Sequence, residues 1–137
     1  MAIRGGCLCG AVRFSIEADA PLGVRQCWCR VCQYLGAGSG TVNAIFPKDA
    51  VTISGPLTDY VCAADSGSVM HRRFCARCGT PVLSEAEPRP SQIIVRVGTL
   101  DEPDLARPAA IIWAKSAPSW ACLDPDLPQG EGQFPPP

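Results

Sequence analysis

The sequence carries little charge: Asp, Glu, Lys and Arg make up 18% of its 137 residues, and the formal net charge is −1. Intrinsically disordered chains are usually richer in charge and poorer in apolar residues, which here reach 47%. Most nucleic-acid-binding proteins have a global basic field, which a near-neutral chain lacks. We therefore expect a globular protein that does not bind nucleic acid.

Long hydrophobic runs are also missing. No stretch approaches the roughly 20 apolar residues of a membrane span, so we expect no membrane association. The residues from Met1 to Cys7 lack the apolar core of a secretory signal. Both absences favour a cytoplasmic location, where a reducing environment makes disulfide bonds rare.

Long helices are not expected, because 13 glycines and 14 prolines interrupt the chain. Alternating apolar residues predict short strands instead. These strands span residues 11–16, 41–46, 51–54, 57–62, 69–74, 80–84, 92–97 and 111–115. Gly55-Pro56 predicts a hairpin turn between its two flanking strands. Only one turn after Cys29 and residues 102–106 are expected to be helical.

The length corresponds to one domain. No internal repeat or linker divides the chain, so residues 1–124 are assigned to a single, mainly β domain. Residues 125–137 form a tail that holds five of the 14 prolines. Such a tail is expected to be either disordered or laid on the surface as an extended strip.

Cysteine is the residue type in clear excess, with nine copies. Seven of them fall into three groups, which are Cys7 with Cys9, Cys27 with Cys29 and Cys32, and Cys75 with Cys78. The odd count, the tight spacing and the absence of an export signal argue against a disulfide scaffold. The three groups therefore predict metal ligands.

The first and third groups together supply four thiolates, which is the ligand set of a closed, tetrahedral, structural zinc site. Cys75 and Cys78 can grip one metal ion while the backbone turns, and Gly79 supplies the positive φ that such a turn needs. Gly10 follows the first group in the same way. The alternative is a redox pair at Cys75 and Cys78, although no βαβ pattern accompanies it.

The second group supplies three thiolates, Cys27, Cys29 and Cys32. Three protein ligands and one open position are typical of a catalytic zinc, which can hold a substrate thiol as a thiolate at neutral pH. The alternative is a second closed site, completed by one of three residues: Cys62, Cys122 or His71. Otherwise the two lone cysteines are expected in the core, and the histidine on a surface strand.

Arginine is favoured over lysine, since Lys48 and Lys115 are the only lysines among 12 basic residues. Four arginines lie in or directly before a cysteine group: Arg30, Arg72, Arg73 and Arg77. They could offset the excess negative charge of zinc-bound thiolates or hold carboxylates in bidentate pairs. Solvent-exposed positions on strands are the alternative for each of them.

In this order, and with these flanking glycines, the three cysteine groups resemble the family of glutathione-dependent formaldehyde-activating (Gfa-like) enzymes, to which the centromere-protein-V domain is related. The resemblance covers most of the chain. The matching segments are GCLCGAVRF at 6–14, CWCRVC at 27–32, RFCARCGT at 73–80, Ile112-Trp113, Trp120 and DPDLP at 124–128.

The resemblance implies a β-tent of stacked antiparallel sheets stapled by zinc, with residues 1–124 as the zinc-binding domain. It implies two zinc ions, one structural at Cys7, Cys9, Cys75 and Cys78, and one catalytic at Cys27, Cys29 and Cys32. The implied activity is that of a carbon–sulfur lyase, which joins formaldehyde or another small aldehyde to the thiol of glutathione, giving S-(hydroxymethyl)glutathione, or runs the reverse cleavage.

Two positions depart from the family pattern. The family usually has a histidine where this chain has Trp28, and often another where this chain has Ile111. A positioned histidine can transfer protons at neutral pH. Two further hypotheses therefore stay open: a non-catalytic zinc module that recognises a small thiol or a partner protein, and a nucleic-acid-binding zinc ribbon that uses local arginine clusters.

Overall fold

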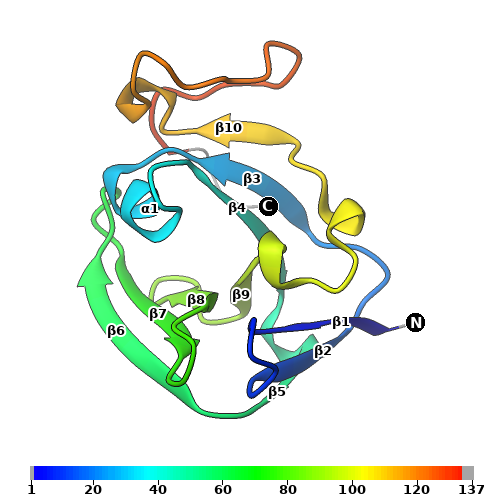
Figure 1. Ribbon diagram of the computed structural model, residues 1–137. Helices are drawn as coiled ribbons and strands as arrows, with labels where there is room; N and C mark the ends of the chain where they lie inside the picture. The colour runs from blue at the N-terminus through cyan, green and yellow to red at the C-terminus, as the bar shows by residue number, and fades with distance from the viewer. Residues whose placement is uncertain (1, 134–137) are drawn as a thin grey trace.

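Two stacked β-sheets make up the computed structural model, which describes residues 2–133 (Figure 1). The smaller sheet has the strand order β1-β2-β5, and the larger has the order β10-β3-β4-β9-β8-β7-β6. Within these residues the strand pairs are antiparallel except β10 and β3, which run parallel. The expected mainly β fold of stacked, largely antiparallel sheets is confirmed.

The elements are short, and each of the eight predicted strands has a counterpart in the structure. The strands are β1 (Ala2–Gly6), β2 (Arg13–Glu17), β3 (Gly23–Cys27), β4 (Thr41–Pro47), β5 (Val51–Ser54), β6 (Leu57–Ala63), β7 (Val69–Cys75), β8 (Pro81–Ala86), β9 (Gln92–Arg96) and β10 (Ala110–Ile112). The helix is α1 (Arg30–Leu35), and the 3-10 turns are η1 (Lys48–Ala50), η2 (Val97–Thr99), η3 (Pro103–Ala106) and η4 (Ala114–Ser116). No helix among these described residues is both long and apolar enough to cross a membrane.

The hydrophobic core joins one face of each sheet. Phe14 and Ile16 of β2 belong to the same buried cluster as Ala44 and Phe46 of β4. Successive side chains of a strand point to opposite faces. Asn43, between two core-facing neighbours on β4, therefore points away from this core. The alternation leaves one face of the larger sheet available for polar side chains.

The predicted hairpin at Gly55-Pro56 is wrong. β5 pairs with β2 in the smaller sheet, and β6 pairs with β7 in the larger one. Gly55 has φ +111°, and a Cβ there would lie 2.1 Å from the carbonyl oxygen of Ala11. Only glycine fits this conformation and this close approach, so the dipeptide carries the chain from one sheet to the other instead of folding it back.

Two strands, β1 and β3, were not predicted. β1 ends in Gly5-Gly6, which has no alternating pattern, but a Cβ at Gly5 would lie 2.5 Å from the ring of Phe14. Glycine in that strand makes room for the aromatic ring on its neighbour. In β3 the adjacent polar residues Arg25 and Gln26 interrupt the alternation of apolar and polar residues that would predict a strand. One face of this strand is turned toward a cavity, which Arg25 lines.

The last predicted strand, 111–115, is shorter than expected. β10 ends at Ile112, and Trp113 has φ +57°, which turns the chain into η4. The described part of the tail runs beside β10 as an extended strip: the Ile111 N–H donates to the Pro128 carbonyl at 2.9 Å, and the Gly130 N–H donates to Ile111 at 2.9 Å. Residues 134–137 of the predicted tail lie outside the described residues.

Candidate functional site

Four cysteine sulfurs meet where the two sheets come together. Cys7 and Cys9 lie in the loop from β1 to β2. Cys75 ends β7, and Cys78 lies in the turn from β7 to β8. Their sulfur atoms all lie within 4.8 Å of one another. The Cys7–Cys9 and Cys9–Cys75 sulfur separations are 3.6 Å and 3.8 Å. Zinc–sulfur bonds of about 2.3 Å give a tetrahedral edge of about 3.8 Å, so the four sulfurs fit a zinc ion.

Backbone N–H groups support these sulfurs. Cys7 Sγ accepts a hydrogen bond from Val12 N at 3.2 Å, and Cys75 Sγ accepts one from Arg77 N at 3.3 Å. Hydrogen bonding from Thr80 lowers the pKa of Cys78 to about 5, which favours its thiolate at neutral pH. Such donors stabilise the ionised form that binds metal.

The glycines after each pair behave as predicted. Gly10 has φ +81° and Gly79 has φ +77°, and each directly follows a cysteine of the four-sulfur group. Each lets the backbone turn sharply, so that two sulfurs from one short segment face the same point. The segments are far apart in sequence, since Cys9 and Cys75 are 66 positions apart. A metal ion here would cross-link the smaller sheet to the larger.

The second cysteine group lies at the opposite end of the larger sheet from β6. Cys27 ends β3, Cys29 is the N-cap of α1, and Cys32 lies in the first turn of that helix. Cys29 Sγ accepts the Cys32 N–H at 3.3 Å, which caps the helix and holds two sulfurs close. All three side chains are buried, and their sulfurs lie within 4.8 Å of one another.

The three thiols strongly perturb one another. Hydrogen bonding from Cys27 lowers the pKa of Cys32 to about 2, with further help from Thr41 and the positive charge of Arg96. Hydrogen bonding with Cys29 raises the pKa of Cys27 in turn. The group therefore holds negative charge on sulfur even though burial disfavours it. Both cysteine groups could hold a metal ion, and all-thiolate donor sets are compatible with zinc.

No fourth His, Cys, Asp or Glu joins this group among residues 2–133. Cys62, half-buried, accepts a hydrogen bond from Arg72 Nε at 3.3 Å. Cys122 is exposed, which corrects the expected core position. It follows the surface turn at 118–121 rather than a strand, so no core face takes it up.

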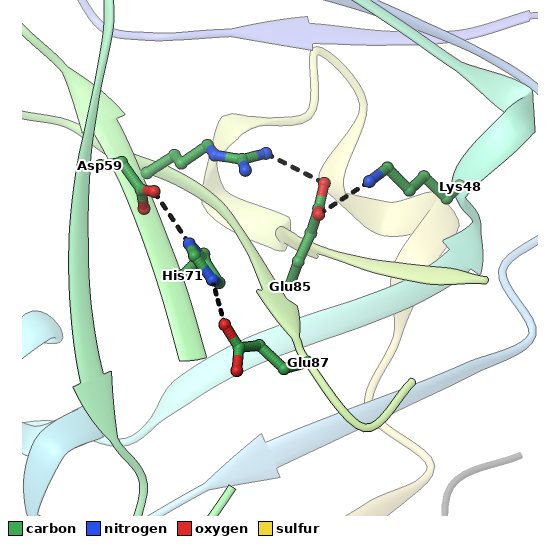
Figure 2. A network of polar contacts seen from close by, with 6 residues as sticks. Lys48, Asp59, His71, Glu85 and Glu87 are labelled. Atoms are coloured by element: carbon green, nitrogen blue, oxygen red, sulfur yellow. Dashed lines mark hydrogen bonds and ion pairs between the residues drawn. The ribbon is translucent and has the colours of Figure 1, made fainter. Parts of the chain in front are cut away.

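His71 is occupied elsewhere, on the other face of β7 from Arg72. Its ring lies between Asp59 Oδ2, 2.9 Å from Nδ1, and Glu87 Oε2, 2.8 Å from Nε2 (Figure 2). This is the expected surface strand position, and both ring nitrogens are engaged by carboxylates. Glu85 bonds Lys48 in the same view.

The three thiols open into a cavity of about 510 Å³, which is partly open to solvent. Its floor is the face of the larger sheet that points away from the hydrophobic core. A second hollow of about 500 Å³ shares Asn43, Arg89, Ile94, Ile112 and Gln133 with the first, so the two form one groove. Concave surfaces that combine apolar side chains with a few convergent polar groups are typical of small-molecule sites.

Arginine dominates the charge of this groove. Its lining residues include four arginines and one acid, the rim residue Asp65, which accepts a hydrogen bond from the Arg30 N–H at 3.1 Å. The arginines are Arg25, Arg72, Arg89 and Arg96. Burial lowers the pKa of Arg96, and the nearby sulfurs of the three-thiol group oppose that change. The groove is therefore suited to anionic ligands.

Of the arginines noted from the sequence, one lines the groove, namely Arg72. Arg73 pairs with Glu85 at 3.0 Å on the opposite face. Arg30 lies over the ring of Tyr34, 5.2 Å from its centroid. Arg77 is exposed. These three are surface positions.

Other groove residues escaped the sequence analysis, above all Ser84, Arg96 and Asn43. The sequence does carry a signal for Arg96. Ile93 and Val95 occupy the core side of β9, so the alternate position Arg96 had to lie at a surface or in a cavity. Which of these it is depends on the neighbouring strands.

The two residues that replace family histidines differ in position. Trp28 is buried and does not line the groove, since its ring packs against Gly40, where a Cβ would lie 3.0 Å away. Ile111 is fully buried. The adjacent Ile112 and Trp113 do line the groove and pack against the three thiols. The left-handed backbone of Trp113 is a strained conformation of the kind that clusters at functional sites.

Two known proteins are similar to this chain in sequence or in fold. A Halomonas elongata protein, which carries the provisional name of a glutathione-dependent formaldehyde-activating enzyme, is 26% identical over 130 residues, covering 90% of this chain and 82% of that protein. The crystal structure of a Rhodobacter sphaeroides protein shares the fold, with a TM-score of 0.59 and 23% identity over 77% of this chain and 96% of that one.

The family comparison covers most of the chain. The family model described as glutathione-dependent formaldehyde-activating enzyme matches residues 2–116, which include all seven clustered cysteines. The resemblance seen in the sequence motifs is thereby confirmed. The chain belongs to the family of glutathione-dependent formaldehyde-activating enzymes.

Proposed function

We propose that this protein is a zinc-dependent carbon–sulfur lyase that joins a small aldehyde, formaldehyde or a relative, to the thiol of glutathione and also catalyses the reverse cleavage. The observation that carries the proposal is the buried three-thiol group at one end of an arginine-lined groove. Family membership supports a glutathione-dependent, formaldehyde-activating role.

The cysteines divide into two proposed metal sites. Cys7, Cys9, Cys75 and Cys78 would hold a structural zinc, because four protein ligands leave no open position. Cys27, Cys29 and Cys32 would hold a catalytic zinc, because no fourth ligand joins them among residues 2–133. A zinc ion with an open position stabilises a substrate thiolate at neutral pH.

The protein's own side chains would bind and orient the substrates. Glutathione has two carboxylates, which suit the guanidinium groups of the groove. Ile112 and Trp113 pack beside the three thiols and give that end of the cavity an apolar wall. In the forward reaction the substrate thiol loses its proton to solvent, and its sulfur forms a bond to the carbonyl carbon. The carbonyl oxygen then takes a proton from water, so that no oxidant or reductant is needed.

The absence of a groove histidine bears on the proton transfers. The chain's single histidine, His71, lies on the opposite face of the larger sheet between two carboxylates. Water would therefore have to supply and accept the protons, and binding and positioning of the two reactants would carry most of the rate enhancement.

The test is the rate of adduct formation by the zinc-loaded protein with formaldehyde and glutathione, followed by NMR against the spontaneous reaction. We expect acceleration that Cys29→Ser abolishes and that the matched variant Cys122→Ser, at an exposed site, retains. Thiol binding without acceleration would favour a non-catalytic zinc module instead. A protein with metal bound and no acceleration for any small aldehyde would refute the lyase.

A further inference from the structure

Three buried side-chain polar atoms have no hydrogen-bond partner among residues 2–133: Trp28 Nε1, Ser84 Oγ and Arg96 Nε. Trp28 does not line the cavity of the three thiols, whereas Ser84 and Arg96 do. Ser84 is 1% exposed and Arg96 is 8% exposed, and both line the same cavity as the cysteines. Buried donors are almost always satisfied in folded proteins, because leaving them unpaired is costly. Two such donors in one cavity indicate a bound group that accepts hydrogen bonds.

The strand register brings these donors to one face. Ser84 on β8 lies opposite Arg72 on β7 and opposite Ile94 on β9. Arg96 follows Ile94 by two positions, so its side chain points to the same face. Arg72 is 7% exposed and also lines the cavity.

Hydrogen bonds hold both guanidinium groups in place. Arg96 donates through Nη1 to Asn43 Oδ1, and Asn43 Nδ2 donates to Thr41 Oγ1 at 3.0 Å. Arg72 donates through Nε to Cys62 Sγ at 3.3 Å. Among residues 2–133 no further hydrogen bond engages the other N–H groups of these two guanidiniums. An arginine fork matches the two oxygens of a carboxylate.

The donors lie close to the reacting centre. Thr41 is opposite Cys27, and Asn43, two positions on, is opposite Arg96. Strand spacing and rise then place the Cα atoms of Cys27 and Arg96 roughly 12 Å apart. The Arg96 side chain reaches toward the thiols from this distance, and it lines the same cavity as Cys27, Cys29 and Cys32. A ligand anion bound here would lie within a few bonds of the reacting atoms.

We infer that Ser84, Arg96 and Arg72 form a carboxylate subsite beside the three-thiol group, for a carboxylate carried one or two bonds from the reacting carbon or sulfur. The inference rests on the proposed function and narrows its substrate class. Two compounds of that chemistry fit: an aldehyde with an adjacent carboxylate, that is, a 2-oxo acid, or a short mercapto acid. Formaldehyde offers one neutral carbonyl oxygen and no negative charge to pair with the two guanidinium groups.

Binding of short thiols tests, without relying on turnover, whether a mercapto acid supplies the carboxylate. Thioglycolate and 2-mercaptoethanol are matched in length and differ in the carboxylate, and both can be titrated into cobalt-substituted protein by the sulfur-to-cobalt absorption band. Whether a 2-oxo acid supplies the carboxylate is tested by comparing glyoxylate with acetaldehyde as partners for glutathione on the zinc-loaded protein. Each reaction is measured against its spontaneous rate. We expect a preference for the carboxylate compound, on the order of tenfold or more, in at least one arm.

Three variants decide whether the subsite is responsible. Ser84→Ala and Arg96→Gln should each reduce the preference severalfold, whereas Arg107→Gln, at an exposed position away from the groove, should retain it. Ser84→Ala removes one hydroxyl group, so it keeps the test valid if Arg96→Gln does not fold. Equal treatment of charged and neutral compounds in both arms, or a preference that survives Ser84→Ala unchanged, would overturn the subsite. A thioglycolate preference without any adduct formation would support the subsite and refute the lyase.

Discussion

The two cysteine groups should differ in how much they stabilise the fold, and pairs of cysteine-to-serine substitutions measure this. Cys75→Ser/Cys78→Ser removes one side of a cross-link between residues 66 positions apart in sequence, taking Cys9 and Cys75 as its ends. Cys29→Ser/Cys32→Ser removes two ligands from a group that lies within a single short segment. The first variant should therefore lose far more stability than the second.

The chain-entropy relation for cross-links gives the magnitude. A closed loop of 66 residues corresponds to about 4 kcal/mol of the free energy of unfolding. The short loop between Cys27 and Cys32 corresponds to about 2 kcal/mol by the same relation. A domain of this size unfolds with an entropy of about 0.29 kcal/mol/K. The two variants should then lower the Tm of the zinc-loaded protein by about 15 °C and about 7 °C.

Differential scanning calorimetry of the zinc-loaded proteins measures both shifts. Cys62→Ser/Cys122→Ser is the matched control, because it also removes two thiols but touches neither group. With a strong chelator present, the wild-type protein should fall to about the Tm of the first variant or lower. Equal losses from the two ligand pairs, or a control as unstable as either, would refute the division into a cross-linking and a local site.

Three further perturbations follow from single contacts. Ser84→Ala should raise the free energy of unfolding by about 1 kcal/mol in urea denaturation, since it removes an unpaired buried hydroxyl; a loss of stability would contradict this. The carboxylates of Asp59 and Glu87 raise the pKa of His71. The ion pairs of His71 should therefore stabilise the fold fully below about pH 6.5, and this stabilisation should be lost as the pH rises through the raised pKa. NMR titration of His71 checks the direction of the shift, and His71→Gln should show a free energy of unfolding that depends less on pH. Gly55→Ala should cost about 2–3 kcal/mol in the same denaturation assay, because φ is +111° and the added carbon would lie 2.1 Å from a carbonyl oxygen; a cost under 1 kcal/mol would show that the crossing relaxes easily.

The ligand groups were readable from the sequence because their signals are local. Cys27, Cys29 and Cys32 lie within six consecutive residues, so their spacing alone keeps their sulfurs close together. Gly10 and Gly79 could be assigned a positive φ for the same reason. The meeting of Cys9 with Cys75 was inferred from ligand counting, not from periodicity, and depends on how the sheets stack.

Which strands pair with one another was harder to predict from the sequence. The residues around Gly55-Pro56 were recognised as two strands, but a turn-forming dipeptide does not say whether its flanking strands pair with each other. Here the apolar side chains of β5 pack on β2, and this burial outweighs the local preference for a hairpin. The position of Cys122 failed for a similar reason, because a residue outside any strand has no core face to join.

Composition and spacing by themselves determined the mainly β class, the short helical turns, the grouping of seven cysteines and the family, since each depends on residues close together in sequence. Only the tertiary structure decided that Ser84, Arg72 and Arg96 share a cavity with the three thiols. These residues lie on strands that pair side by side in the sheet although they are separated in the sequence. Whether the polar face of such a sheet is exposed to water or lines a groove depends on which other segments of the chain pack over it.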